Sequence, residues 1–221
     1  MSAISTTRSS TTLDAPARTS AVLRRAAPFA GVLYAGLSFG GDLAIGPFPE
    51  GTTSGTALRS FYVAHGAQVA LGGALLLWSA VCFAVFGAAL WARTRERAVS
   101  AGLILLGVAL ETAAELYEAG VFRFLGQHGA DARIAPAALQ AWQLSATEIG
   151  SAGGLVLVMV GAAIAAFGYR ALPRWIAATG LVVVAAEFTS VFFFASLAFL
   201  LWAAVAGVAL AVRPEPSPTI S

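Results

Sequence analysis

The chain has 221 residues, of which 58% are apolar and 11% are charged, and its formal net charge is +2. A soluble domain carries about 25% charged residues, so this composition predicts a protein surrounded by lipid, and the weak, scattered positive charge excludes a nucleic-acid partner. Because Cys82 is the only cysteine, an internal disulfide and a cysteine-based metal or redox centre are also excluded.

Residues 1–24 form the first predicted segment, a tail rich in Ser, Thr, Ala and Arg. The tail contains no apolar run long enough for the core of a signal peptide, so we expect it to be disordered and cytoplasmic. Arg24 and Arg25 precede an apolar stretch of membrane length, which favours the positive flank of a first membrane helix over a twin-arginine export signal. A transmembrane domain is predicted at 25–213, and a short cytoplasmic tail at 214–221.

Six apolar segments follow one another within this domain, and each is predicted to be a transmembrane helix. They lie at 26–46, 66–91, 98–118, 149–169, 174–187 and 190–212. The last two belong to one apolar stretch, 175–212, which as a single helix would be about 57 Å long, nearly twice the thickness of the hydrocarbon core. We therefore expect a turn at its polar interruption, Glu187-Phe188-Thr189-Ser190.

The Arg residues predict the orientation of these helices, because positive residues are retained in the cytoplasm. With the amino terminus inside, ten of the thirteen Arg residues lie in cytoplasmic segments, and only Arg59, Arg123 and Arg133 lie outside. A five-helix arrangement would place Arg213 outside and leave one helix far too long to span. The predicted fold is therefore all-α, an integral membrane bundle of six transmembrane helices with both termini cytoplasmic.

The predicted outer connections, 47–65 and 119–148, are long and contain helix-compatible runs, whereas the inner connections are short and rich in Arg. Pro136 suits the first turn of a helix, because its missing N–H would have no partner there. Such a helix either lies on the outer membrane surface or extends the fourth helix outward, and the sequence leaves both possibilities open.

Glu111, Glu115 and Glu118 are the sharpest candidate functional residues. Their i, i+4, i+7 spacing places three carboxyl groups on one face of the third predicted helix. Counted from Arg97 at 1.5 Å per residue, Glu111 lies roughly 21 Å into the membrane. A carboxylate at that depth costs about 2.5 to 3.5 kcal/mol, so we expect it to face the bundle interior or a wet cavity.

Three further residues join these glutamates in a candidate ligand-binding pocket because they fall at a similar outward depth: Asp42, His65 and Glu148. If the helix ends converge, the pocket faces outward and suits a small cation, an amine or protons. Positively charged side chains are then expected beside the acids, and the candidates are Arg59, Arg123, His65 and His128.

A competing interpretation is that several of these acids are solvated helix ends, namely Glu115, Glu118, Glu148 and Glu187. A metal centre built on His65 and His128 has no support from ligand spacing, and the HExxH motif is absent. We therefore predict no metal, no cofactor and no catalytic residue.

Gly36-Leu37-Ser38-Phe39-Gly40 matches the GxSxG nucleophile elbow by letter, but that motif works at a strand-to-helix turn and here lies inside a predicted membrane helix. We expect Gly36, Ser38 and Gly40 to form a small-residue surface that another helix approaches closely. The same packing is predicted for the glycines of the fourth helix, Gly150, Gly153, Gly154 and Gly161.

Several short motifs resemble a family of uncharacterised actinobacterial multi-pass membrane proteins that is defined as a domain of unknown function. The motifs are the Arg-flanked first helix, Phe48-Pro49-Glu50, Phe61-Tyr62-Val63-Ala64-His65, Leu172-Pro173-Arg174-Trp175 and Leu201-Trp202. The similarity covers residues 25–213. It implies a multi-pass protein of the bacterial plasma (inner) membrane, and it brings no catalytic residues.

Three functions are compatible with these features. The first is a non-enzymatic membrane protein that binds or transports a small cationic or protonatable solute through the outward-facing acidic pocket around Glu111. The second is a structural or accessory subunit whose glycine-rich faces pack against a partner membrane protein or a second copy. The third and least favoured is an intramembrane hydrolase that uses Ser38 or a histidine-containing site.

Overall fold

The computed structural model of the chain describes residues 27–47, 49, 53–150, 154–187 and 192–212, and this part is all-α. It contains seven α-helices, a short 3-10 turn (Ala27–Phe29) and a π-helical segment (Ile164–Gly168). The α-helices are α2 (Ala30–Ile45), α3 (Gly55–Thr94), α4 (Ala98–His128), α5 (Pro136–Gly150), α6 (Gly154–Ala163), α7 (Arg174–Glu187) and α8 (Phe192–Val212).

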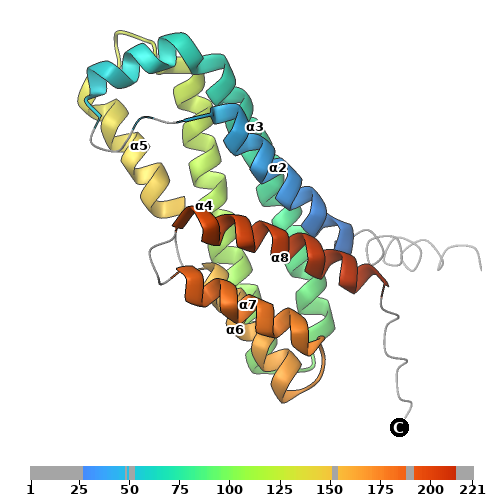
Figure 1. The fold of residues 1–221 in the computed structure, drawn as a ribbon. Coiled ribbons are helices and arrows are strands. Elements are labelled where there is room, and N and C mark those ends of the chain that lie inside the picture. The colour runs from blue at the N-terminus through green and yellow to red at the C-terminus, as the bar shows by residue number, and fades with distance from the viewer. Residues whose placement is uncertain (1–26, 48, 50–52, 151–153, 188–191, 213–221) are drawn as a thin grey trace, which may run out of the picture.

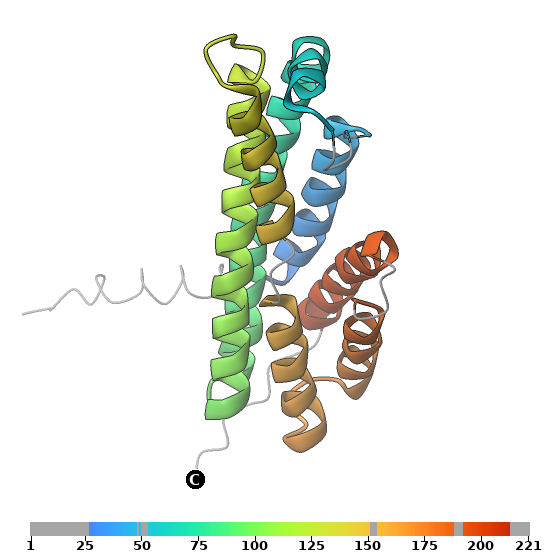
Figure 2. The same cartoon turned by 90° about the vertical axis from the view of Figure 1, so that its left-hand side faces the viewer.

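Two of the described helices, α3 and α4, are long and apolar enough to cross a membrane. They form an antiparallel hairpin that is the longest feature of the molecule (Figures 1 and 2). Glycines allow the two backbones to approach closely: a Cβ added at Gly73 would lie 2.5 Å from the Arg123 backbone nitrogen and 2.9 Å from the Ala119 carbonyl oxygen. Small residues at crossings are typical of helix association in lipid.

The shorter helices pack around this hairpin. α2 lies against α3, α6 lies against α4, and α8 runs obliquely across the bundle between α2 and α7 (Figure 1). Their buried side chains form two apolar clusters. The cluster that we call the α8 core includes Phe83, Phe86, Phe199 and Trp202. The second, the α5 core, consists of Ile45, Leu58, Tyr62, Val69, Phe122, Leu125 and Leu139.

The second predicted span, 66–91, was too short, because α3 begins at Gly55. Ser54 caps its first turn, and its hydroxyl oxygen accepts a hydrogen bond from the Ala57 backbone N–H at 3.4 Å. Leu58 and Tyr62 then bury this part of the helix in the α5 core. Figure 1 shows α3 changing direction within its amino-terminal part, so the extra turns do not continue straight along the hairpin.

The third predicted span, 98–118, also ended too early, because α4 continues to His128. Phe122 and Leu125 pack in the α5 core, and this packing carries the helix past the membrane length that set the prediction. Glu118 consequently lies well inside a helix of 31 residues instead of at its end.

The predicted outer helix begins at Pro136, as expected, and ends at Gly150. Leu139, Gln143 and Ala146 are buried on one of its faces. α5 packs on α4 and α3, and α6 then packs on the other part of α4 (Figure 2). α5 is therefore part of the bundle that packs on the α3–α4 hairpin.

The apolar stretch 175–212 is divided into two helices, as predicted, because α7 ends at Glu187 and α8 begins at Phe192. The Trp202 indole N–H donates a hydrogen bond to the Ile176 carbonyl oxygen at 2.8 Å, so α8 folds back on α7. Residues 188–190, at which the turn was predicted, lie outside the described residues, as do the predicted tails 1–24 and 214–221.

The glycine predictions had mixed outcomes. Gly154 and Gly161 do pack closely, against Glu111 and Ile104 of α4. Among the expected α2 residues, Ser38 packs on Ser79 of α3, whereas Gly36 has open space around it and Gly40 meets the end of one leucine side chain, so the predicted surface is not filled by the described helices. Close approach occurs instead at Gly41, where an added Cβ would lie 2.9 Å from Leu76 of α3. Gly153 lies outside the described residues, and the burial of Gly150 is not described.

Candidate functional site

The three glutamates of α4 lie on the side of the helix that faces into the bundle. Glu111 is only 4% exposed, and Glu115 and Glu118 are partly buried. Gly154 brings α6 against Glu111, since a Cβ added to this glycine would lie 2.9 Å from the Glu111 Cβ. The interpretation of Glu115 and Glu118 as solvated helix ends is therefore wrong. The side chains of Glu148 and Glu187 lie outside the described residues.

Tyr34 of α2 binds the second of these carboxyl groups. Its phenol O–H donates a hydrogen bond to Glu115 Oε1 at 2.8 Å. The ring is 3% exposed and is held by two aromatic neighbours, with centroid distances of 5.0 Å to Phe83 and 5.9 Å to Phe199. The α8 core therefore fixes the donor, and the pair joins residues that are far apart in the sequence.

The other carboxyl oxygen, Glu115 Oε2, is buried and has no hydrogen-bond partner among the described residues. The Thr112 hydroxyl, on the preceding turn of α4, is also buried and also has no hydrogen-bond partner among the described residues. A buried polar atom without a partner costs about 1 to 3 kcal/mol. Glu115 Oε2 therefore has unmet hydrogen-bonding capacity within the described residues.

Ser38 lies one turn beyond Tyr34 on α2 and is 7% exposed. Its hydroxyl donates to the Ser79 hydroxyl oxygen at 3.0 Å, and Ser79 donates in turn to the Leu76 carbonyl oxygen at 3.0 Å. Both serine protons are thus used in structural hydrogen bonds. No histidine is among the partners of Ser38 in the described residues, so the geometry of an activated serine nucleophile is absent there.

Asp42 lies two turns beyond Tyr34 and is exposed. It is within electrostatic reach of Glu115 and Glu118. The Tyr34 hydroxyl is likewise within electrostatic reach of Glu111. Of the six residues predicted for the pocket, the structure places Glu111, Glu115 and Glu118 on the inward side of α4, and it adds Tyr34 as the partner of Glu115.

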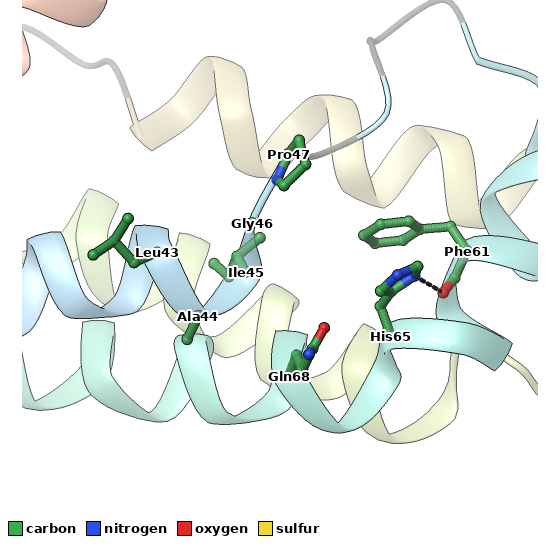
Figure 3. Close-up of a pocket in the computed structure, with 8 residues that line it drawn as sticks. All are labelled: Leu43, Ala44, Ile45, Gly46, Pro47, Phe61, His65 and Gln68. Atoms are coloured by element: carbon green, nitrogen blue, oxygen red, sulfur yellow. Dashed lines mark hydrogen bonds between the residues drawn. The ribbon is translucent and has the colours of Figure 1, made fainter.

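His65 does not join this group. It is exposed and lines a separate pocket of about 500 Å³, in which its ring stacks on Phe61 with a centroid distance of 4.8 Å (Figure 3). The His65 Nδ1 atom lies 3.2 Å from the Phe61 carbonyl oxygen. The remaining lining residues are Leu43, Ala44, Ile45, Gly46, Pro47 and Gln68, so none of the acids contributes to this pocket.

The expected positive partners also lie elsewhere. The Arg59 guanidinium donates to the Ile134 carbonyl oxygen, Arg123 is exposed, and the His128 ring packs on Phe124. In the part of the chain that the structure describes, the ion pair is Arg133 with Asp131, at 2.6 Å. Hydrogen bonds from Arg133 lower the pKa of Asp131 to about 2.

The acids do not form a metal centre in the described residues, where no three His, Cys, Asp or Glu side chains are placed to hold a metal ion. The hydrogen bond between Tyr34 and Glu115 was missed by reasoning from the sequence. Its signal was the spacing of Tyr34, Ser38 and Asp42, which repeats every four residues and so lies on one face of α2.

No protein-family model matches the chain, and no curated protein or solved structure does so either. The resemblance of residues 25–213 to actinobacterial membrane proteins stays a prediction. Tyr34, Glu115 and their neighbours are interpreted below from their geometry and chemistry.

Proposed function

We propose that the chain is a multi-pass protein of the bacterial plasma (inner) membrane, with six transmembrane helices and both termini in the cytoplasm. Its apolar surface supports this proposal, because large apolar side chains such as Trp78 (65% exposed) and Leu201 (66% exposed) point away from the bundle. A soluble protein rarely leaves so many such residues in water. The four helices other than α3, α4 and α5 are apolar and shorter, and helices of this kind span by locally thinning the bilayer.

Within this bundle, we propose that the site around Glu115 binds a small cationic or protonatable solute that enters from the outer side. The observation that carries the proposal is the Glu115 carboxyl group, which receives one hydrogen bond from Tyr34 and leaves a buried oxygen without a partner. Among the described residues, the charged groups whose electrostatic influence on Glu115 is resolved are Glu118 and Asp42, which are both acidic. Negative charges gathered at membrane depth require a cation or protons to compensate them.

The aromatic rings beside the site are compatible with an organic ammonium ion as well as an inorganic one. Tyr34, Phe83 and Phe199 pack together at the inner end of the carboxyl groups, and a ring face attracts a cation. A solute seated there would satisfy Glu115 Oε2 and contact the rings. This geometry favours small monovalent cations and amines over divalent metals, which need several ligands at once.

Thermal unfolding of the purified protein in detergent tests this function with Na⁺, ammonium and methylammonium as probes. A bound probe at 100 times its Kd stabilises the folded state by about 2.7 kcal/mol. We expect Glu115→Gln and Glu111→Gln to remove that stabilisation and the uptake of the probe into liposomes. Glu96→Gln is the matched control, because Glu96 is exposed in the short connection between α3 and α4. Unchanged stabilisation in Glu115→Gln would contradict the proposal.

A second candidate function, a subunit that packs against another membrane protein or a second copy, is favoured by the open glycine face of α2. Gly36 is exposed and has no atom within 4 Å of an added Cβ, so a foreign helix could approach it. Purification in mild detergent distinguishes the two functions. A stoichiometric partner that is lost in Gly36→Leu supports the second, and a lone protein that still binds a probe supports the first.

A further inference from the structure

The pocket beside His65 lies between the end of α2 and the amino-terminal part of α3 (Figure 3). Its volume of about 500 Å³ is within the range of small-molecule sites in proteins, which is roughly 300 to 1,000 Å³. Leu43, Ile45, Pro47 and Phe61 give it apolar walls. None of its described lining residues is an acid, a lysine or an arginine, so the electrostatic character of the pocket is set by its hydrogen-bonding groups.

α2 ends at the pocket with backbone carbonyl groups that lack their usual donors. In an uninterrupted helix, the Leu43 and Ile45 carbonyl oxygens would accept hydrogen bonds from the N–H groups four residues later. Those positions are Pro47 and Pro49, which have no N–H. The positive φ of Gly46, 71°, also ends the helical course at this point. Because the carbonyl end of a helix carries a partial negative charge, this wall attracts positive charge and hydrogen-bond donors.

His65 adds a second acceptor, and Phe61 fixes its orientation. The His65 Nδ1 atom lies 3.2 Å from the Phe61 carbonyl oxygen. Because a carbonyl oxygen only accepts, Nδ1 carries the proton, and the neutral imidazole presents Nε2 as an acceptor. Stacking of the two rings, at a centroid distance of 4.8 Å, holds this orientation. Figure 3 shows the Nδ1 bond on the side of the ring away from α2, and it shows the Gln68 amide pointing into the same space.

We propose that this pocket binds an organic primary ammonium ion, R–NH₃⁺. The three N–H donors of such a group match three kinds of acceptor around the pocket, which are the carbonyl end of α2, His65 Nε2 and the Gln68 side-chain oxygen. The apolar walls contact the carbon chain of the ligand. The negative end of the α2 dipole disfavours a carboxylate or a phosphate. A neutral alcohol brings one donor and no charge, so it is a weaker ligand.

This site is separate from the one proposed around Glu115, because the two share none of the described residues that line the pocket or bind the carboxyl group. The proposal therefore goes beyond the function proposed above and does not depend on it. Two sources offer the same chemistry: a free amine, and the ammonium head group of phosphatidylethanolamine in the surrounding membrane. The test below distinguishes them.

Nitrogen-15 NMR of labelled histidine tests the proposal in the full-length protein, because the chain has two histidines, His65 and His128. The His65 signals are those that disappear in His65→Phe. In phosphatidylcholine nanodiscs at one fixed pH, butylammonium should shift the His65 Nε2 resonance to saturation and leave the His128 signals unchanged. Tetramethylammonium has no N–H and butan-1-ol has no charge, so neither should shift the resonance at the same concentration. An equal shift with either of these two probes would overturn the proposal.

Nanodiscs that contain phosphatidylethanolamine identify the source of the ammonium group. A His65 Nε2 resonance that is already shifted in these nanodiscs, before any amine is added, supports the lipid head group. A resonance that shifts only when butylammonium is added supports a free amine. If the resonance shifts in neither experiment, the pocket does not bind an ammonium ion.

A second measurement is the Kd of butylammonium, determined by calorimetry in the Glu115→Gln background so that binding at Glu115 does not contribute. We expect His65→Phe to raise this Kd by about 10- to 100-fold, because a hydrogen bond to a charged group is lost while an aromatic ring remains to stack on Phe61. His128→Phe is the matched control. His128 also packs on a phenylalanine four residues earlier, Phe124, at a centroid distance of 4.9 Å, but it does not line the pocket.

An unchanged Kd in His65→Phe, or an equal rise in His128→Phe, would overturn the assignment of the ammonium site to this pocket. The function proposed for Glu115 is tested separately, because stabilisation by Na⁺, an ion without N–H donors, is measured in the His65→Phe protein. Loss of butylammonium binding with retained stabilisation by Na⁺ supports both sites. Retained butylammonium binding in Glu115→Gln supports the His65 pocket whether or not the Glu115 site binds a solute.

Discussion

Tyr34→Phe is the substitution that most directly probes the buried site, because it removes one hydroxyl and keeps the ring that packs on Phe83 and Phe199. The loss is a hydrogen bond of 2.8 Å to Glu115 Oε1. Such a bond contributes about 1.5 to 3 kcal/mol when the acceptor is ionised and about 0.5 to 1.5 kcal/mol when it is neutral. The expected cost is therefore larger at high pH, where the carboxyl group is ionised, than at low pH.

Unfolding of the purified protein in mixed micelles, measured across pH, gives this cost. Tyr117→Phe is the matched control, because the Tyr117 hydroxyl pairs with the neutral Ser145 hydroxyl at 2.8 Å on the exposed surface. In the Glu115→Gln background, the acceptor is always neutral, so the cost of Tyr34→Phe should lose its dependence on pH. If Tyr34→Phe costs no more than Tyr117→Phe at any pH, the buried hydrogen bond is absent and the site assigned to Glu115 is wrong.

Three further predictions concern the fold around the site. Gly73→Leu should destabilise the protein by about 1 to 3 kcal/mol, because the Cβ of the new side chain meets the α4 backbone. Gly102→Leu is the control and should not destabilise the protein, because Gly102 has open space around it. Thermal unfolding of both variants checks this prediction. Trp202→Phe should cost about 1 to 3 kcal/mol in the same assay, since it removes the buried hydrogen bond from the indole N–H to the Ile176 carbonyl oxygen and part of the ring that fills the α8 core. The pair of Asp131 with Arg133 stabilises the fold at pH values above the unfolded-state pKa of Asp131, and this stabilisation is lost as the pH falls through about 2, the pKa of Asp131 in the folded state. Asp131→Asn breaks the pair, so its free energy of unfolding should not show this loss when the protein is titrated with acid. An acid titration of Asp131→Asn that matches the wild type would contradict the prediction.

Local patterns in the sequence were sufficient to place most helices. Helix starts and ends could be predicted where a short local signal sets them. Such signals are the apolar runs, the polar interruption at Glu187 and the proline at 136, each of which affects the backbone only within a few residues. The shared face of Glu111 and Glu115 follows from helical periodicity alone. The extensions of α3 to Gly55 and of α4 to His128 could not be predicted, because they depend on packing in the α5 core.

The face that each helix turns toward its neighbours was decided only by the tertiary structure. Gly36 and Gly41 are both small residues of α2, but they are five residues apart and so lie about 140° apart around the helix axis. Packing against α3 places Gly41 inside and leaves Gly36 open. The same rotation of α2 turns Tyr34 toward Glu115 across the bundle. No local pattern contains this rotation, because it is set by contacts between residues that are distant in the chain.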